Sequence, residues 1–314
     1  MSTAVDAAPA VAATAPRRTR ITASKRRQWG AAYTLVLPFF VIFVAMIVVP
    51  LVYAGYLSFF RKRLIGGTSF AGFENYAKAL TDPLFLSGVG RMAIFLVIQV
   101  PIMLALALFF ALALDSGTMK LAKFSRLAIF VPYAVPGVVA TLMWGYLYGP
   151  DFGPFAQITR ELGLGPPPFL TRTGMLFSIM NIVNWEFIGY NMIIIFAALR
   201  SLPSELYEAA RVDGASEVRI ATSIKIPAVR PALLLTVIFS VIGTFQLFTE
   251  PQLMRTLAPT VIGTAYTPNL YAYNVAFVNQ DANYAAALAF LLGIVIVIVS
   301  YIVQLSAQRK ERRS

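Results

Sequence analysis

The sequence predicts an all-α membrane protein with six transmembrane helices. Of its 314 residues, 58% are hydrophobic and only 13% are charged, so the chain is far more apolar than a soluble domain. Long stretches contain no Asp, Glu, Lys or Arg, and the basic residues gather between those stretches. Together these features indicate helices that cross a bilayer and are joined by charged loops.

Six apolar stretches account for the predicted helices, since ~20 apolar residues suffice to span a bilayer. The expected spans are residues 31–59, 88–114, 125–149, 174–199, 231–250 and 283–307, within a membrane domain of residues 29–308. The first stretch is too long for the apolar core of a cleavable signal peptide, which predicts an uncleaved anchor. Residues 256–280 also lack charge, but their prolines and asparagines favour an outside loop with a short interfacial helix.

The basic residues orient the predicted bundle. Residues 1–28 combine Ala, Pro and Thr with R-R-T-R and K-R-R, which predicts a disordered cytoplasmic tail, and residues 309–314 form a second cytoplasmic tail. With both termini inside the cell, 18 of the 26 Lys and Arg residues face the cytoplasm, as the positive-inside rule requires. The cluster Arg61–Arg63 falls on the outside, and the sequence offers no reason for it.

Several classes of function are disfavoured. The chain has neither His nor Cys, so it lacks the commonest general base and all thiolate metal ligands. It also lacks the G-x-x-x-x-G-K-S/T phosphate loop. The net charge of +12 could suggest nucleic acid, but its distribution follows membrane topology. We therefore expect no catalytic residues, no metal, no cofactor bound by this chain and no nucleic-acid partner, with the lipid bilayer as its environment.

Residues 200–230 form a polar segment between the fourth and fifth predicted spans. Glu205 and Glu208 suit the positive N-terminal end of a short helix, and Gly214 can adopt the left-handed conformation that ends it. Ser216 can cap a second short helix, which Pro227 is predicted to end. The segment is therefore expected to be a helix–turn–helix at the membrane surface.

The same segment resembles the EAA loop of ABC-importer permeases. That motif runs E-A-A-x3-G-x9-I-x-L-P, and this chain departs from it only at Ile226, where Leu is usual. The resemblance assigns ATPase coupling to Glu208, Ala209, Ala210, Asp213, Gly214, Ile224 and Pro227. It implies that this cytoplasmic coupling loop docks on an ATPase subunit. An ordinary interhelical hairpin is the alternative.

Further motifs extend the resemblance over nearly the whole chain after the tail. F-A-G-F-E-N-Y at 70–76, F-V-P-Y-A-V-P-G-V-V at 130–139 and F-Q-L-F at 245–248 resemble carbohydrate-uptake permeases of the maltose-transporter larger-permease or glycerol-phosphate-permease type. Gly90-Arg91 departs from the polar pair that is common there. The resemblance implies a bacterial inner-membrane importer with a second, non-identical permease, two ATPase subunits that use ATP and Mg, and an extracytoplasmic solute-binding protein.

A sugar is the expected solute, with two alternatives. Amides, hydroxyls and aromatic rings outnumber fixed cations in the spans, which favours a neutral di- or oligosaccharide over glycerol-phosphate compounds or another polyol-like solute. An ATP-independent secondary transporter is the more distant alternative, but a docking loop has no purpose without a cytoplasmic motor.

Polar residues within the spans are candidates for the substrate path, because each is costly in lipid and usually faces the bundle interior. In the third span, Tyr133, Gly137, Thr141, Trp144 and Tyr148 are predicted to share one face, with kinks at Pro132 and Pro136. In the fourth, Asn181, Asn184 and Asn191 share a stripe, while Glu186 and Tyr190 lie nearer the opposite one. In the fifth, Thr236, Ser240, Gly243 and Glu250 stack, with Gln246 at the edge.

The candidates chosen are Tyr133, Thr141, Trp144, Asn184, Glu186, Tyr190, Asn191, Gln246 and Glu250. Helix packing is the alternative for each of them, and an aromatic belt at the interface is favoured for Tyr148. The sequence leaves open which stripe of the fourth span faces the path.

Overall fold

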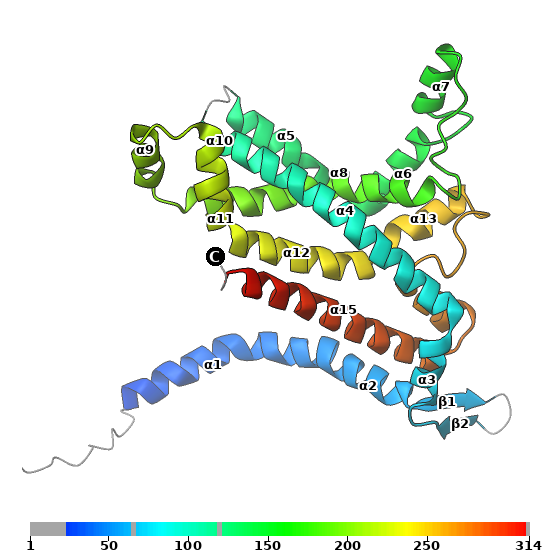
Figure 1. Cartoon of the computed structure of the whole chain (residues 1–314). Coiled ribbons are helices and arrows are strands. Elements are labelled where there is room, and N and C mark those ends of the chain that lie inside the picture. Colours follow the sequence, from blue (N-terminus) through cyan, green and yellow to red (C-terminus); the bar gives the residue numbers. More distant parts are fainter. Residues whose placement is uncertain (1–22, 64–66, 118–120, 312–314) are drawn as a thin grey trace, which may run out of the picture. The chain divides into compact units, whose positions relative to one another are not determined.

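A computed structural model describes residues 23–63, 67–117 and 121–311 of the chain (Figure 1). It divides into two units, Met1–Tyr53 and Ala54–Ser314, which are described separately. Helices dominate both units, and the β-structure of the described residues is one small hairpin.

The described residues of the first unit, 23–53, are helical. α1 (Ala23–Phe43) begins inside the segment that the sequence predicts as a disordered tail, and residues 1–22 of that segment lie outside the described residues. A π-helical turn, η1 (Val44–Val48), leads into α2 (Val49–Ser58). Pro50 lies two residues after the end of this turn and has no N–H to donate, and the wider turn accommodates its ring within a continuous helix.

The second unit begins within α2. It contains, in order, β1 (Phe60–Arg63), β2 (Gly67–Phe70), α3 (Glu74–Thr81), α4 (Pro83–Asp115), α5 (Ala122–Ala134), α6 (Gly137–Leu147), α7 (Pro154–Glu161) and α8 (Met175–Arg200). It continues with α9 (Glu205–Val212), α10 (Glu217–Ile220), η2 (Ala221–Lys225), α11 (Ile226–Ala228), α12 (Arg230–Phe245), α13 (Thr249–Leu257), α14 (Pro268–Tyr273), η3 (Asn274–Val278) and α15 (Ala282–Glu311).

The helices have the lengths and composition of a membrane bundle. Within the described residues, four helices are long and apolar enough to cross a bilayer: Ala32–Ser58, Pro83–Asp115, Met175–Arg200 and Ala282–Ala307. Two bent pairs, Ala122–Ala134 with Gly137–Leu147 and Glu217–Ala228 with Arg230–Phe245, raise the number to six if each counts as one span. The protein is therefore an all-α membrane protein with four to six spans.

The third predicted span is broken. α5 and α6 meet at an angle of 96°, because Val135 takes an extended conformation before Pro136. The sequence places a kink here, but not a turn of this size. The predicted single face from Tyr133 to Tyr148 therefore does not exist, since Tyr133 lies on α5 and Trp144 on α6.

The fifth predicted span also ends early. α12 stops at Phe245, and Gln246 follows as its C-terminal cap. Glu250 lies in the first turn of the next helix, α13, so it does not stack with Thr236 and Ser240 on one helix as predicted. Residues 246–248 between the two helices are irregular, so helical periodicity does not predict where their side chains point.

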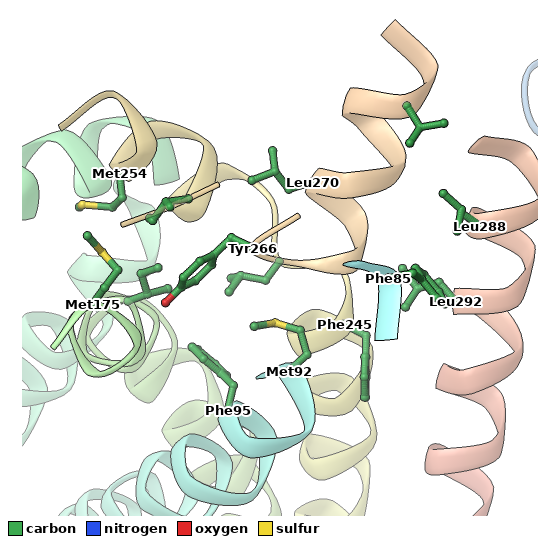
Figure 2. Packing of buried hydrophobic residues seen from close by; sticks show 14 of the residues in the cluster. Phe85, Met92, Phe95, Met175, Phe245, Met254, Tyr266, Leu270, Leu288 and Leu292 are labelled. Carbon is green, nitrogen blue, oxygen red and sulfur yellow. The ribbon is translucent and has the colours of Figure 1, made fainter. Parts of the chain in front are cut away.

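The largest hydrophobic core joins the long helices to the segments that follow α12. Figure 2 shows Phe85, Met92 and Phe95 from α4 near Phe245 from α12, with Leu288 and Leu292 from α15. Met175 from α8, Met254 from α13, Leu270 from α14 and Tyr266 belong to the same cluster. The core thus fixes α13 and α14 against the bundle, although neither is long enough to cross a membrane.

One carboxylate ties three segments together at the start of α4. Asp82 caps this helix by accepting a hydrogen bond from the Leu84 N–H (2.9 Å), and it also accepts from the hydroxyls of Tyr271 (2.7 Å) and Tyr284 (2.8 Å). Burial alone would raise the pKa of Asp82, but these hydrogen bonds outweigh it and lower the pKa below its usual value. Asp82 therefore stays ionised and holds α14 and α15 against α4.

The basic cluster that the sequence left unexplained lies on the hairpin. β1 and β2 are antiparallel, with Phe60 opposite Phe70. Arg61 pairs with Glu74 of α3 at 2.8 Å, so one of the three cations is locally neutralised. The sequence alone does not predict this ion pair, because Glu74 comes close to Arg61 only after the chain has turned through the hairpin.

Candidate substrate path and coupling segment

A cavity of about 330 Å³ lies between α4, α8, α12 and the start of α13. Its lining is Phe95, Gln99, Met103, Val183, Phe187, Tyr190, Asn191, Phe239, Ser240, Gly243, Thr244, Gln246, Leu247, Phe248, Thr249 and Glu250. Four predicted path residues therefore meet here: Tyr190, Asn191, Gln246 and Glu250. The size and the mixture of apolar walls with a few polar groups are typical of a small-molecule site.

Aromatic rings from two helices stack beside the cavity. The Tyr133 ring lies 4.7 Å from that of Tyr190 with the planes 22° apart, and it meets Phe187 edge to face. Tyr190 and Phe187 line the cavity, so Tyr133 supports that wall from α5. Tyr133 itself is exposed and does not line the cavity.

The predicted asparagine stripe of α8 divides between several roles. Asn191 lines the cavity and donates to the carbonyl of Phe187 at 2.9 Å. Asn184 accepts a hydrogen bond from Gln99 of α4 at 3.0 Å, and Asn181 donates to the Tyr148 hydroxyl at 2.7 Å. Asn184 therefore joins α8 to α4 and contacts the path only through Gln99.

Two residues of α6 lie away from this cavity. Thr141 is buried and donates to the Gly137 carbonyl of its own helix at 2.7 Å. Trp144 packs edge to face against Trp185 and lines a second, aromatic cavity of about 420 Å³ with Tyr148 and Phe155. The 96° break therefore separates both from the residues with which they were predicted to act.

Glu186 faces the break between α5 and α6. It is buried, and its Oε1 has no hydrogen-bond partner within the described residues. A Cβ built on Gly137 would lie 3.6 Å from this oxygen, which places the carboxylate at the first residue of α6. This geometry fits a contact between helices better than a contact with substrate.

We expect Glu186→Gln to weaken uptake while leaving the protein assembled. The amide keeps the shape of the side chain but removes its ionisable group, so the variant separates the chemistry of the carboxyl from its size. Uptake kinetics and thermal stability of the same preparation check this. Unchanged values in both measurements would remove Glu186 from the candidate residues.

Sequence reasoning missed the contribution of α4. Phe95, Gln99 and Met103 form one wall of the cavity. A signal was present, because Gln99 is the only side chain able to form strong hydrogen bonds in the charge-free run from 92 to 114. Its amide donates to Asn184 at 3.0 Å and lies 3.3 Å from the Met103 sulfur.

The candidate coupling segment, residues 200–230, has the predicted helix–turn–helix form. α9 carries Glu208, Ala209 and Ala210, and the turn contains Gly214 with φ of +78°. The Ser216 hydroxyl caps α10 by accepting from the Arg219 N–H at 3.3 Å. The predicted left-handed glycine and N-cap are both confirmed.

Pro227 does not end the second helix as predicted. η2 carries Ile224, and the helix continues through Pro227 to Ala228 before it bends by 63° into α12. The π turn is the physical reason, because its wider ring of hydrogen bonds makes room for a proline that lacks an N–H. The same order of π turn and proline occurs at Pro50.

The surface of the coupling segment is exposed and partly apolar. Glu208, Ala209, Asp213 and Gly214 are exposed, and the Val212 side chain is 88% exposed. Arg211 of α9 pairs with Glu217 of α10 at 2.8 Å, and this hydrogen bond lowers the pKa of Glu217. The exposed face of α9 thus combines carboxylates with apolar side chains.

Two curated relatives and one solved structure are similar to this chain. It is 29% identical to the arabinooligosaccharides transport system permease protein AraP of Bacillus subtilis, over 87% of each chain. It is 28% identical to the diacetylchitobiose uptake system permease protein NgcF of Streptomyces coelicolor, over 94% of this chain and 86% of that protein. A chain of a bacterial ABC transporter that imports the acidic polysaccharide alginate has the same fold, with a TM-score of 0.78, 19% identity, and coverage of 91% and 97%.

The family comparison covers most of the chain. The model of the binding-protein-dependent transport system inner membrane component matches residues 31–312, which include the cavity and the coupling segment. The protein therefore belongs to this family of inner-membrane transport components.

Proposed function

We propose that this chain is the permease subunit of an ATP-driven importer that takes up a di- or oligosaccharide. As a member of a transport family it is a permease and not a catalytic enzyme. An extracytoplasmic binding protein delivers the sugar, and both termini of the chain lie in the cytoplasm. The similar permeases AraP and NgcF are named for oligosaccharide and disaccharide uptake, which supports this class of substrate.

The cavity beside Tyr190 carries the proposal. Its aromatic rings can stack on the apolar face of a pyranose, while the amides of Asn191, Gln246 and Gln99 can bind hydroxyl groups. This combination suits a polar solute without charge, because a sugar presents one apolar face and many hydroxyls. The cavity also joins α4, α8 and α12, so relative movement of these helices changes its shape.

Its charge disfavours the glycerol-phosphate alternative. Glu250 is buried and is the only carboxylate residue among the lining residues, which include no Lys or Arg. Two like charges 4 Å apart repel by about 4 kcal/mol at an effective dielectric constant of 20. A phosphate or carboxylate beside an ionised Glu250 would meet that repulsion, whereas a neutral sugar would not.

We therefore expect the charge at position 250 to set which solutes pass. Glu250→Gln should retain uptake of neutral oligosaccharides within a few-fold, and Glu250→Arg should reduce it strongly because the long cation occupies the cavity. Competition of a uronic-acid disaccharide against labelled uptake should appear in Glu250→Gln but not in the parent. Equal competition in both proteins would contradict a charge filter.

ATP hydrolysis belongs to partner chains in this proposal. We assign ATP and Mg to two ATPase subunits, one of which docks on the exposed face of α9, where Val212, Leu206 and Ala209 offer apolar surface. Glu208, Ala209, Ala210, Asp213, Gly214, Ile224 and Pro227 are the coupling residues. This chain then binds no cofactor of its own.

A second, non-identical permease completes the complex. An ATPase dimer has two clefts, and this chain supplies one coupling segment. Four to six spans are also few for enclosing a disaccharide, so the path is completed at an interface. The resemblance to permeases that pair with a different subunit makes the partner a different chain.

Reconstitution tests the proposal. Liposomes that contain this chain, its partner permease and the ATPases, supplied with binding protein and internal ATP, should accumulate a labelled arabinooligosaccharide or diacetylchitobiose. Omission of any subunit or of ATP should abolish accumulation. Uptake by this chain alone without ATP would show a secondary transporter and overturn the assignment.

A further inference from the structure

One ion pair of the coupling segment is buried, unlike its other charged contacts. Lys225 Nζ lies 2.6 Å from Asp115 Oδ2, and the two side chains are only 5% and 4% exposed. The other ion pairs of the described residues, Arg61–Glu74 and Arg211–Glu217, are about half exposed. Exposed ion pairs contribute little to stability. Separating a buried pair is costly, because it leaves two charges without water, so this pair holds η2 against the end of α4.

The π turn directs Lys225 inward. η2 ends at Lys225, and a π turn accommodates one extra residue, which rotates the following side chains by about 100° around the helix axis. Lys225 and Val229 are buried, while Thr222 and Ser223 just before them are exposed. A basic residue thus enters the interior from a segment whose other cations face solvent.

Lys225 also contacts the first helix of the coupling segment. Its Nζ lies 4.8 Å from the centre of the Tyr207 ring, within the range of a cation–π interaction. Tyr207 precedes Glu208 and is one of the few partly buried residues of α9. Burial and the nearby Asp115 carboxylate raise the pKa of Tyr207, against the effect of Arg200, which agrees with this closeness.

Asp115 connects these contacts to the cavity wall. It is the last residue of α4, the same helix that presents Gln99 and Met103 to the cavity. The sixteen helical steps from Gln99 to Asp115 span about 24 Å along the helix axis. Ala107, Ala111 and Leu114 lie in one buried cluster with Val229 and the end of α8, so this half of α4 is packed along its length.

We propose that Asp115 and Lys225 form a positioning joint that transmits movement of α9 to α4 and thereby to the cavity wall. The inference rests on the proposed role of residues 200–230 in ATPase docking. α9 moves with Lys225 through the Tyr207 ring, and Lys225 moves with α4 through the buried ion pair. Neither residue touches the sugar or the nucleotide.

The test compares ATP hydrolysed with sugar transported in the complete reconstituted complex. Asp115→Asn and Lys225→Met should each lower sugar transported per ATP at least tenfold, while the ATPases still co-purify. Asp115→Glu should restore most of the ratio, because it retains the charge. Arg61→Met, which breaks an exposed pair elsewhere, is the matched control and should leave the ratio unchanged.

A double variant keeps the test decisive if a single variant fails to fold. Asp115→Leu with Lys225→Met replaces the buried pair by apolar groups, which proteins tolerate well. It should fold, bind the ATPases and remain uncoupled; a normal ratio in this variant would overturn the joint, as would detachment of the ATPases. Failure of the parent complex to transport any sugar or to retain ATPases would instead count against the proposed function.

Discussion

Gly214→Pro should abolish uptake while the chain remains folded in the membrane. Gly214 has φ of +78° in the turn between α9 and α10, and proline is restricted to φ near −65°. The substitution therefore forces the two short helices apart and displaces the docking face. Uptake into liposomes, normalised to the amount of purified complex, should fall to background.

Gly214→Asn is the matched control, because asparagine tolerates the left-handed conformation better than other non-glycine residues. A Cβ at this position would meet no heavy atom within 4 Å, so conformation alone is tested. The asparagine variant should retain most uptake. Normal uptake by a well-expressed proline variant would contradict the coupling role of the turn.

Gly189→Val should prevent α5 from packing on α8. A Cβ on Gly189 would lie 2.1 Å from the Ile129 carbonyl oxygen and 2.8 Å from the Phe130 Cα, which are backbone atoms that cannot move aside. Close approach of helices at small residues is a general feature of membrane proteins. Overpacking of this kind costs about 1–3 kcal/mol or more, so the thermal midpoint and the yield of monodisperse protein should fall.

Gly293→Ala in α15 is the control for this prediction. A Cβ there meets nothing within 4 Å, and alanine favours a helix by about 1 kcal/mol over glycine. Its thermal midpoint should stay equal or rise. An unchanged midpoint in Gly189→Val would show that the contact between α5 and α8 is looser than the structure describes.

The sequence predicts this fold well because membrane helices depend on local composition. Apolar runs with at most one charged residue predict α4, α8 and α15, and the Gly214 turn and the Ser216 cap follow from the intrinsic preferences of those residues. These features require no knowledge of distant neighbours.

Other features depend on packing between segments. The sequence places a kink at Pro136, but the size of the bend is set by how α6 packs on α8 and α13. Helical periodicity assumes a continuous helix, so it predicts that Trp144 shares a face with Tyr133, and Glu250 with Ser240. In the structure, a break in the helix separates the two residues of each pair. The pairs Gln99–Asn184 and Asp115–Lys225 join residues far apart in sequence and have no local signature.

The π turn at η2 makes the spacing of the E-A-A-x3-G-x9-I motif determine the direction of a side chain as well as the length of the segment. The nine residues between Gly214 and Ile224 include the start of η2, where each residue turns the helix by a smaller angle than in an α-helix. That interval therefore fixes an angle as well as a length. Deleting one residue within it would shorten the segment by only about 1.5 Å, yet would turn Lys225 by about 100° away from Asp115. In this part of the chain, rotation of the helix is more sensitive to insertions and deletions than its reach.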